Sequence, residues 1–402
     1  MEEQKQAKQQ IQIDSNILNT LSKAVRVSKK KGNLDRYEYK KGINASKTEA
    51  LFLLFENVLE EFAKSNTYED VLSTASTLLK GVNYTIKDIE ELCLTLSKSY
   101  TNETTSIGIF ISAAINKIIK ETDTINLDFT GIEVNYLGYC LTRGNLIIKG
   151  SVGGYTGQSM QSGSITIHGN AGGNTGCSMQ SGSITIHGNS EDATGRFMKD
   201  GSIIVDGNAG SFTGDYMKGG SITIHGNAGN WTGGSMEDGS IIVDGNAGKY
   251  TGDFMQSGSI TIHGNSGDFT GDYMKGGSII VEGNSDADTG ISMQSGSITI
   301  HGNAGDATGY YMEGGSIIVD GNAGDWTGYS MQSGSITIHG NAGEGTGRLS
   351  EGGEIRINGK IGSLWYSRAV IYNGRFYYAK KWSIKGILAR IKTVLILLLS
   401  DG

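Results

Sequence analysis

A pattern of apolar and polar positions repeats every 19 residues through more than half of the chain. Each unit holds a short segment in which Ile or Val occupies alternate positions, as in Ser183-Ile184-Thr185-Ile186. This alternation of β-branched residues is typical of a β-strand with one buried face. One strand in every short unit predicts a solenoid, in which each repeat packs only on its neighbours.

The rest of each unit is too rich in glycine for a helix. A methionine recurs at every nineteenth position from Met160 to Met331, and a threonine from Thr156 to Thr346. We expect a second short strand around the Thr-Gly pair, with the methionine side chains pointing inward. Glycine before the strand and Gly-Asn after it, such as Gly201 and Gly207, are expected to supply the positive-φ positions of tight turns.

The residue after each strand decides how many repeats make one coil. All six histidines lie at this position and mostly alternate with acids, in the order His168, His187, Asp206, His225, Asp244, His263, Glu282, His301, Asp320 and His339. With 19 residues per coil, most histidines lie beside a carboxylate, whereas 38 per coil would stack acids on acids. The alternation therefore favours one coil per repeat.

The repeat register predicts the limits of the solenoid. Leu127 and Gly138 fall 19 residues before Leu146 and Gly157, so a degenerate first coil is expected from about residue 125. The last clear strand contains Ile355. We therefore expect a mainly β protein with a parallel β-helix of about 13 coils over residues 125–362.

Residues 1–124 have a helical pattern and predict a small bundle of four or five helices. Ser46 and Glu49 form a candidate capping box before an apolar helical face, and Gly81 fits a helix end. Further N-caps are expected at Thr67, Thr85 and Thr104 or Thr105.

Residues 363–402 predict a β-hairpin and an amphipathic helix. Asn373-Gly374 between two short apolar segments is a type I′ hairpin signal. The helix that follows has an apolar face flanked by basic residues, and its candidate contact residues are Ile384, Lys385, Arg390, Ile391, Lys392 and Leu395. Two interpretations stay open: the segment caps the solenoid or mediates oligomer contacts, or it lies on an anionic membrane surface.

Composition and charge narrow the classes of function. Residues 126–360 carry 23 acidic and 10 basic groups, which argues against nucleic acid as a partner. The three cysteines have no motif spacing and are odd in number, which favours a reducing compartment. The chain has no proline, so its turns rely on glycine and asparagine. The first twelve residues are polar and lack the apolar core of a secretory signal, so we expect a cytoplasmic protein.

The column of histidines and acids is the most suggestive chemistry in the chain. A metal site or an acid–base pair is conceivable, but a catalytic group needs a unique environment, and these groups recur along the repeats. We therefore interpret them as a surface ladder that fixes register, which acid below about pH 4 should loosen. No nucleophile elbow, phosphate loop or Cys-x-x-Cys motif is present, so we predict no catalytic residue, cofactor or metal.

Three other patterns suggest functions less well. An ice-binding face needs two outward threonine columns, but the strand position alternates threonine with isoleucine. The methionine column suggests soft-metal binding, although stacked methionines are the usual packing of a solenoid lumen. Acids on turns suggest calcium, but the nonapeptide calcium repeat is absent.

An interrupted stripe of aromatic residues precedes the threonine column. Its members are Tyr155, Phe212, Trp231, Tyr250, Phe269 and Trp326. Exposed aromatic side chains are enriched in contact surfaces, so this stripe is the candidate interaction surface for a protein or a glycan.

The unit Gly201–Gly220 resembles the GXXGXXXG repeat of the glutamate synthase C-terminal domain and of the family of repeat-containing subunits in formylmethanofuran dehydrogenase. The resemblance covers about residues 126–360. It implies a right-handed β-helix that acts as a non-catalytic scaffold. The glutaminase, flavin, iron–sulfur and molybdopterin parts of those enzymes are absent from this chain, so the resemblance assigns no catalytic residue.

Together these observations predict a non-catalytic scaffold or self-assembly protein. Its partner would be another protein or a second copy, bound through the helical domain or the ends of the solenoid. The alternative is an accessory structural subunit of an oxidoreductase like those of the resembled families.

Overall fold

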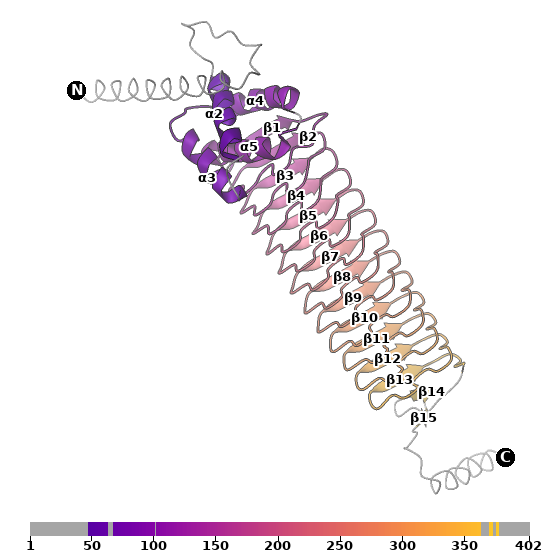
Figure 1. Ribbon diagram of the computed structural model, residues 1–402. Coiled ribbons are helices and arrows are strands. Elements are labelled where there is room, and N and C mark those ends of the chain that lie inside the picture. Colours follow the sequence, from indigo (N-terminus) through magenta and orange to yellow (C-terminus); the bar gives the residue numbers. More distant parts are fainter. Residues whose placement is uncertain (1–46, 63–66, 101, 363–369, 373–374, 378–402) are drawn as a thin grey trace, which may run out of the picture. The chain divides into compact units, whose positions relative to one another are not determined.

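The computed structural model describes residues 47–62, 67–100, 102–362, 370–372 and 375–377. They belong to two compact units, divided between Gly264 and Asn265, and each unit is described by itself. Each contains a stack of parallel coils, and the first unit also contains the helices (Figure 1). The predicted mainly β solenoid with a helical N-terminal part is therefore confirmed.

The first unit begins with four described helices: α2 (Lys47–Phe62), α3 (Tyr68–Leu79), α4 (Ile86–Ser99) and α5 (Thr104–Ile118). Each buries one apolar face, and α5 is buried almost all round, from Ser106 to Ile115. A helix buried on all sides lies at the centre of its domain. Helix α5 packs against α2, α3 and α4, so it is the central element of the helical domain.

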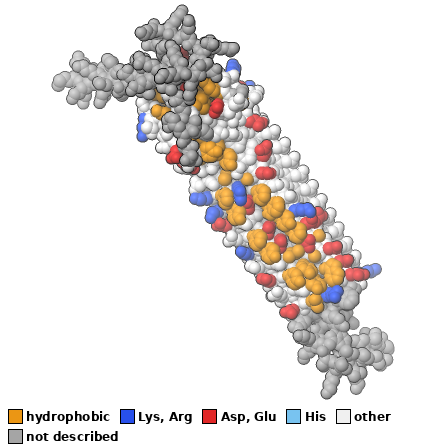
Figure 2. Space-filling view, viewed as in Figure 1, with side chains coloured by type: hydrophobic (Ala, Val, Ile, Leu, Met, Phe, Trp, Pro, Cys, Tyr) orange, Lys and Arg blue, Asp and Glu red, His pale blue; other side chains and the backbone are white. Residues whose placement is uncertain are grey.

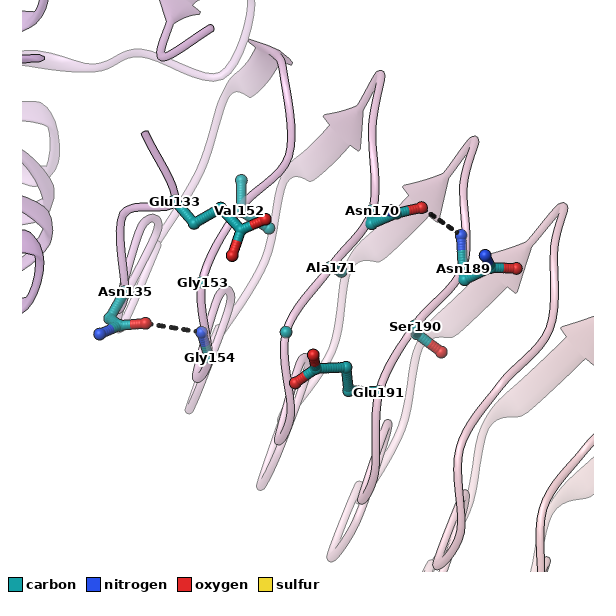
Figure 3. A pocket seen from close by; sticks show the side chains of 11 residues that line it. Glu133, Asn135, Val152, Gly153, Gly154, Asn170, Ala171, Asn189, Ser190 and Glu191 are labelled. Atoms are coloured by element: carbon teal, nitrogen blue, oxygen red, sulfur yellow. Dashed lines mark hydrogen bonds between the residues drawn. The ribbon is translucent and has the colours of Figure 1, made fainter. Parts of the chain in front are cut away.

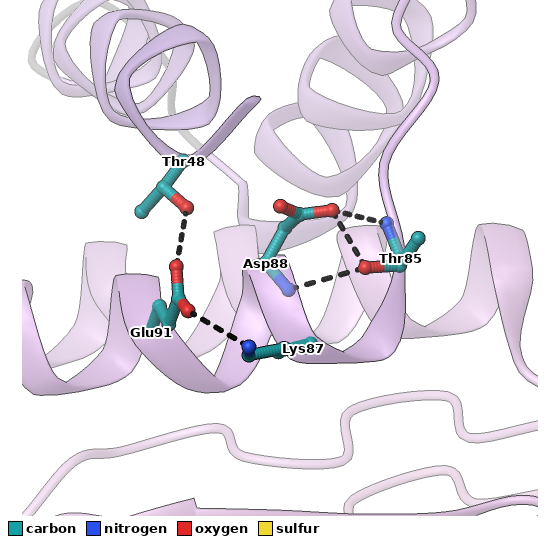
Figure 4. Close-up of polar contacts among 5 residues, drawn as sticks. All are labelled: Thr48, Thr85, Lys87, Asp88 and Glu91. Carbon is teal, nitrogen blue, oxygen red and sulfur yellow. Dashed lines mark hydrogen bonds and ion pairs between the residues drawn. The ribbon is translucent and has the colours of Figure 1, made fainter. Parts of the chain in front are cut away.

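Two of the predicted helix caps are confirmed. The Thr67 side chain accepts a hydrogen bond from the Asp70 amide, and Thr85 and Asp88 form a reciprocal capping box (Figure 4). The same view shows Glu91 bound by Thr48 and Lys87. Gly81 lies two residues beyond the end of α3, and Ser46 lies outside the described residues.

The prediction of a cap at Thr104 or Thr105 is wrong. Glu103 is the N-cap residue of α5, and it makes no side-chain capping bond. Both threonine hydroxyls instead accept hydrogen bonds from the Asn135 amide of the first coil, at 3.2 and 3.1 Å. Tertiary contacts have therefore recruited the side chains that the sequence marked for capping.

The same unit contains eight parallel strands in sequence order. They are β1 (Thr124–Asp128), β2 (Asn145–Lys149), β3 (Ser164–Ile167), β4 (Ser183–Ile186), β5 (Ser202–Val205), β6 (Ser221–Ile224), β7 (Ser240–Val243) and β8 (Ser259–Ile262). From β2 on, each residue pairs with the residue 19 positions later, as Ile184 does with Ile203. One repeat is thus one coil, as predicted.

The predicted register of the first coil is wrong in its strand. Leu127 pairs with Ile148, 21 residues later, whereas Leu127 was expected to align with Leu146. The later part of the coil does keep the 19-residue spacing, since the Cys140 and Ser159 amides make equivalent bonds. Two additional residues between β1 and Tyr136 account for the difference.

Helix α5 docks directly on this first coil. The Ser112 hydroxyl donates to the Tyr136 carbonyl at 2.9 Å, and the Thr142 amide donates to the Asn116 side chain at 3.2 Å. Gly108 lies so close that an added Cβ would overlap the Asn135 carbonyl oxygen. The helical domain therefore covers one end of the solenoid, where unpaired backbone would otherwise be exposed.

The solenoid lumen is filled by the methionine and threonine columns. Every member from Met160 to Met331 and from Thr156 to Thr346 is fully buried. The threonine hydroxyls are satisfied locally, as Thr213 Oγ1 donates to the Gly210 carbonyl at 2.9 Å. The inward orientation of the methionines is as predicted, and soft-metal or ice binding by these buried columns loses its basis.

The expected second strand around the Thr-Gly pair does not form. Alternate residues there have positive φ, as in Phe212 (61°), Gly214 (68°) and Tyr216 (54°). These angles fold the chain into consecutive turns, so only one isolated parallel bridge per coil remains, such as Ala209 to Ala228. Gly201 has φ of 99°, as expected, but Gly207 does not have positive φ; it is glycine because an added Cβ would meet the Gly188 carbonyl at 2.7 Å.

The second unit repeats this architecture. Its parallel strands are β9 (Ser278–Val281), β10 (Ser297–Ile300), β11 (Ser316–Val319), β12 (Ser335–Ile338) and β13 (Glu354–Ile357). They are followed by β14 (Val370–Tyr372), which is parallel to β13, and by β15 (Arg375–Tyr377), which is antiparallel to β14. The antiparallel pairing of the predicted hairpin is confirmed, and its two connecting residues lie outside the described residues.

Candidate interaction surface

The predicted aromatic stripe lies on the turns that follow the bridge of each coil. We call residues at one repeat position in successive coils a column, and the stripe is the first aromatic column. Tyr155, Phe212, Trp231 and Tyr250 belong to the first unit, and Phe269 and Trp326 to the second. All six have φ near +60°, and Tyr155 and Trp326 are 36% and 40% exposed. A bulky residue with positive φ is uncommon and costs roughly 1 kcal/mol.

Within the first unit the rings of this column stack on one another. The ring centroids of Phe212 and Trp231 are 5.1 Å apart and nearly parallel, and those of Trp231 and Tyr250 are 4.7 Å apart. Tyr155 stacks in the same way on Tyr136 of the first coil. The coil spacing of about 4.8 Å imposes this separation, so ring edges rather than ring faces meet the solvent inside a stack.

A second aromatic column, which the sequence interpretation did not identify, lies four residues further along each coil. It is formed by Phe197, Tyr216, Phe254, Tyr273 and Tyr311, with serine at the two positions between them, Ser235 and Ser292. These five side chains are 37–45% exposed. The column is visible only when all repeats are aligned, because serine interrupts it. Figure 2 shows hydrophobic side chains gathered on one face, with acidic and basic side chains among them.

A column of charged residues lies between the two aromatic columns, immediately before the second. In the first unit it contains Arg196, Asp215, Gly234 and Asp253 in successive coils. Arg196 Nε donates to Asp215 Oδ2 at 3.0 Å, and the guanidinium carbon lies 4.8 Å from the Phe197 ring centre. Burial raises the pKa of Asp215 to about 6, although the Arg196 charge opposes that shift.

Asp253 has a different environment from Asp215. Its Oδ1 is buried and has no hydrogen-bond partner, and no lysine or arginine among the described residues forms an ion pair with it. Burial, and to a smaller extent the negative charge of Asp215, raise the pKa of Asp253 to about 6. An incompletely satisfied buried carboxylate is unfavourable for folding, so its presence calls for an explanation.

The predicted ladder of histidines and acids forms on the strand side of each unit. Asp244 binds His225 Nδ1 at 2.6 Å and His263 Nδ1 at 2.9 Å, and Asp320 bridges His301 and His339 in the same way. His187 binds Asp206 and stacks on His168. These groups are about 40–50% exposed and repeat in the same arrangement, which suits a structural ladder better than a catalytic centre.

A shallow polar groove of about 420 Å³ lies near the helical end of the first unit (Figure 3). Its floor contains Gly153 and Gly154, and Glu133 and Glu191 border it. The Asn135 and Asn170 side chains in the groove accept hydrogen bonds from the backbone amides of Gly154 and Asn189. Because both asparagine side-chain oxygens already bind the backbone of the next coil, the groove offers few free polar groups to a ligand.

Metal-ligand clusters and membrane-spanning helices are both absent from the described part of the chain. Within it, no three His, Cys, Asp or Glu side chains are arranged to hold a metal ion. None of the helices described there is both long and apolar enough to cross a bilayer. The predicted C-terminal contact residues, Ile384, Lys385, Arg390, Ile391, Lys392 and Leu395, lie outside the described residues.

Comparison with known proteins assigns no family. No protein-family description matches the sequence, and no curated protein is detectably similar to it. The resemblance to the GXXGXXXG repeat therefore stays a prediction.

Proposed function

We propose that this protein is a non-catalytic scaffold whose two aromatic columns bind a partner protein. The observation that carries the proposal is the exposure of aromatic side chains on the turn face of a solenoid with a fully packed lumen. Aromatic residues are enriched at the centres of protein interfaces, and large exposed apolar patches are rare on monomeric proteins. The cost of positive φ at these bulky residues further argues that they have a use besides folding.

The alternative, an accessory component of a glutamate synthase-like or formylmethanofuran dehydrogenase-like oxidoreductase, has one observation in its favour. The glycine, β-branched and methionine positions of the repeat agree in register with the GXXGXXXG pattern. In that case the partner would be a redox protein, and the complex would contain flavin, iron–sulfur or molybdopterin groups.

Affinity purification of the tagged full-length chain from its native cells, with the intact complex mass measured, tests both. We expect a stoichiometric complex that a Phe212→Ala/Trp231→Ala variant loses, because the exposed Phe212 ring and the half-buried Trp231 ring form one stack. Alanine already occupies this column at Ala193 and Ala307, so the variant should fold.

A matched control removes apolar surface from the strand face instead. Ile204 and Ile242 are 37% and 38% exposed, and alternate coils already have threonine at their position. The Ile204→Thr/Ile242→Thr variant should keep the complex. Equal binding by the wild-type protein and the aromatic variant would refute the proposed surface, and redox cofactors in the complex would favour the alternative.

A further inference from the structure

Asp215 and Asp253 occupy the same repeat position two coils apart but differ in the residues of the preceding coil, which we describe as lying above them. Above Asp215 are Arg196 and Phe197, and above Asp253 are Gly234 and Ser235. The backbone is the same in both places, because the Phe197 amide donates to the Asp215 carbonyl at 3.0 Å and the Ser235 amide donates to the Asp253 carbonyl at 2.6 Å. Only the side chains are different.

The surroundings of Asp215, which we call the upper site, show how this surface holds a guanidinium. Arg196 forms an ion pair with Asp215 and lies 4.8 Å and 5.8 Å from the ring centres of Phe197 and Tyr216. An arginine binds well here because its planar group can stack on rings while its N–H groups reach a carboxylate. The chain thus contains its own example of an occupied site.

The surroundings of Asp253, which we call the lower site, have the same carboxylate but no cation. Asp253 Oδ1 is buried and without a hydrogen-bond partner, and Gly234 contributes no side chain. Tyr216 and Phe254, 41% and 42% exposed, flank Ser235 in the second aromatic column. They are two coils apart, roughly 10 Å, which leaves room for one planar group between the rings.

We propose that the site formed by Asp253, Gly234, Ser235, Tyr216 and Phe254 binds an arginine side chain from an extended segment of the partner protein. The guanidinium would take the position that Arg196 takes one site above, paired with the Asp253 carboxylate and between the two rings. The excess of acidic groups over residues 126–360 favours a basic segment. This inference rests on the proposed scaffold function and names the chemistry of its partner.

The probe for this site is the peptide acetyl-Gly-Arg-Gly-amide, with its citrulline counterpart as the uncharged control. Binding to the full-length protein would be measured by ligand-observed NMR titration. We expect the dissociation constant for the arginine peptide to be at least five-fold lower than for citrulline. Asp253→Asn and Gly234→Arg should each raise it at least five-fold, the first by removing the charge and the second by filling the site from within.

Two variants control for general effects. Asp206→Asn removes a carboxylate from the strand side, and Ile242→Thr removes apolar surface there; both should bind the arginine peptide like wild type. Equal affinity for both peptides, or unchanged binding by Asp253→Asn, would overturn the inference. If Asp253→Asn keeps the cellular complex while Phe212→Ala/Trp231→Ala loses it, the scaffold function stands without this site. If the peptide binds but no complex is found, the site stands and the scaffold function fails.

Discussion

At the scale of single residues, the same type of side chain has opposite effects on stability at two positions. Asp244 lies between two histidines on the strand side, whereas Asp253 is partly buried without a cation. Hydrogen bonds, that from His225 first, lower the pKa of Asp244, and burial raises the pKa of Asp253 to about 6. The sign of each shift determines how stability depends on pH.

Asp253→Asn should stabilise the protein at neutral pH. A folded-state pKa above the ordinary 3.8 means that Asp253 favours the folded state at low pH and that this contribution is lost as the pH rises towards about 6. We expect the variant to gain about 1–2 kcal/mol at pH 7.5 and almost nothing at pH 4. Urea unfolding at both pH values measures it, and a loss of stability at pH 7.5 would contradict the account.

Asp244→Asn should have the opposite effect. Because the pKa of Asp244 is lowered, its contribution is present above about pH 4 and is lost as the pH falls through the lower folded value. We expect a decrease of up to about 3 °C in the unfolding midpoint at pH 6, since exposed ion pairs contribute little. The two proteins should converge once the pH has fallen below the lowered pKa of Asp244. Identical midpoints at pH 6 would mean that the ladder does not contribute to stability.

At the scale of elements, the sequence predicts the strands well and the turns poorly. The alternation of Ile184 and Ile186 identifies a half-buried strand from local information alone. Nothing local announces that Phe212 and Tyr216 have positive φ, because that conformation depends on hydrogen bonds to the neighbouring coils. The predicted second strand fails for this reason.

The candidate site was predictable to a similar extent. The first aromatic column could be found from one residue type at one spacing. The Asp253 site could not be found in this way, because it depends on a difference between two coils. One coil has Arg196, and the other has no side chain at the same position, Gly234. The cap predicted at Thr104 or Thr105 failed through another distant contact, with Asn135.

The junction between α5 and the first coil should depend on Gly108. An added Cβ would overlap the Asn135 carbonyl, which is backbone and has little freedom to move. We expect Gly108→Ala to cost about 2–3 kcal/mol, although alanine favours a helix more than glycine does. Thermal unfolding followed by circular dichroism measures the loss. Gly81→Ala is the control, because no atom lies within 4 Å of its added Cβ; equal effects of the two would refute tight docking.

At the scale of the whole molecule, the backbone repeats after one coil, whereas the pattern of charged side chains on the surface repeats after two. Each coil has 19 residues, but the histidine and acid ladder repeats after two coils. Deleting residues 202–239 should place His187 beside Asp244 and Arg196 beside Asp253. Deleting residues 202–220 should place His187 beside His225 and leave Arg196 beside Gly234.

We therefore expect the deletion of 38 residues to be tolerated better than the deletion of 19. The 38-residue deletion should keep one cooperative unfolding transition and should have the higher midpoint, because it restores the ion pair of His187 and gives Asp253 a cation. Scanning calorimetry compares the two at equal concentration. A lower midpoint for the 38-residue deletion would show that coil number matters more than the matching of faces.

This double period has a consequence for how such a protein changes in evolution. Recombination between nearly identical repeats can add or remove any whole number of coils without disturbing the lumen, because each coil from Met160 to Met331 places the same methionine and threonine there. Only even steps preserve the sequence of charges outside. Packing in the lumen is therefore compatible with any number of added coils, whereas the surface charges match only when that number is even. Variants with an odd number of added coils should need compensating substitutions.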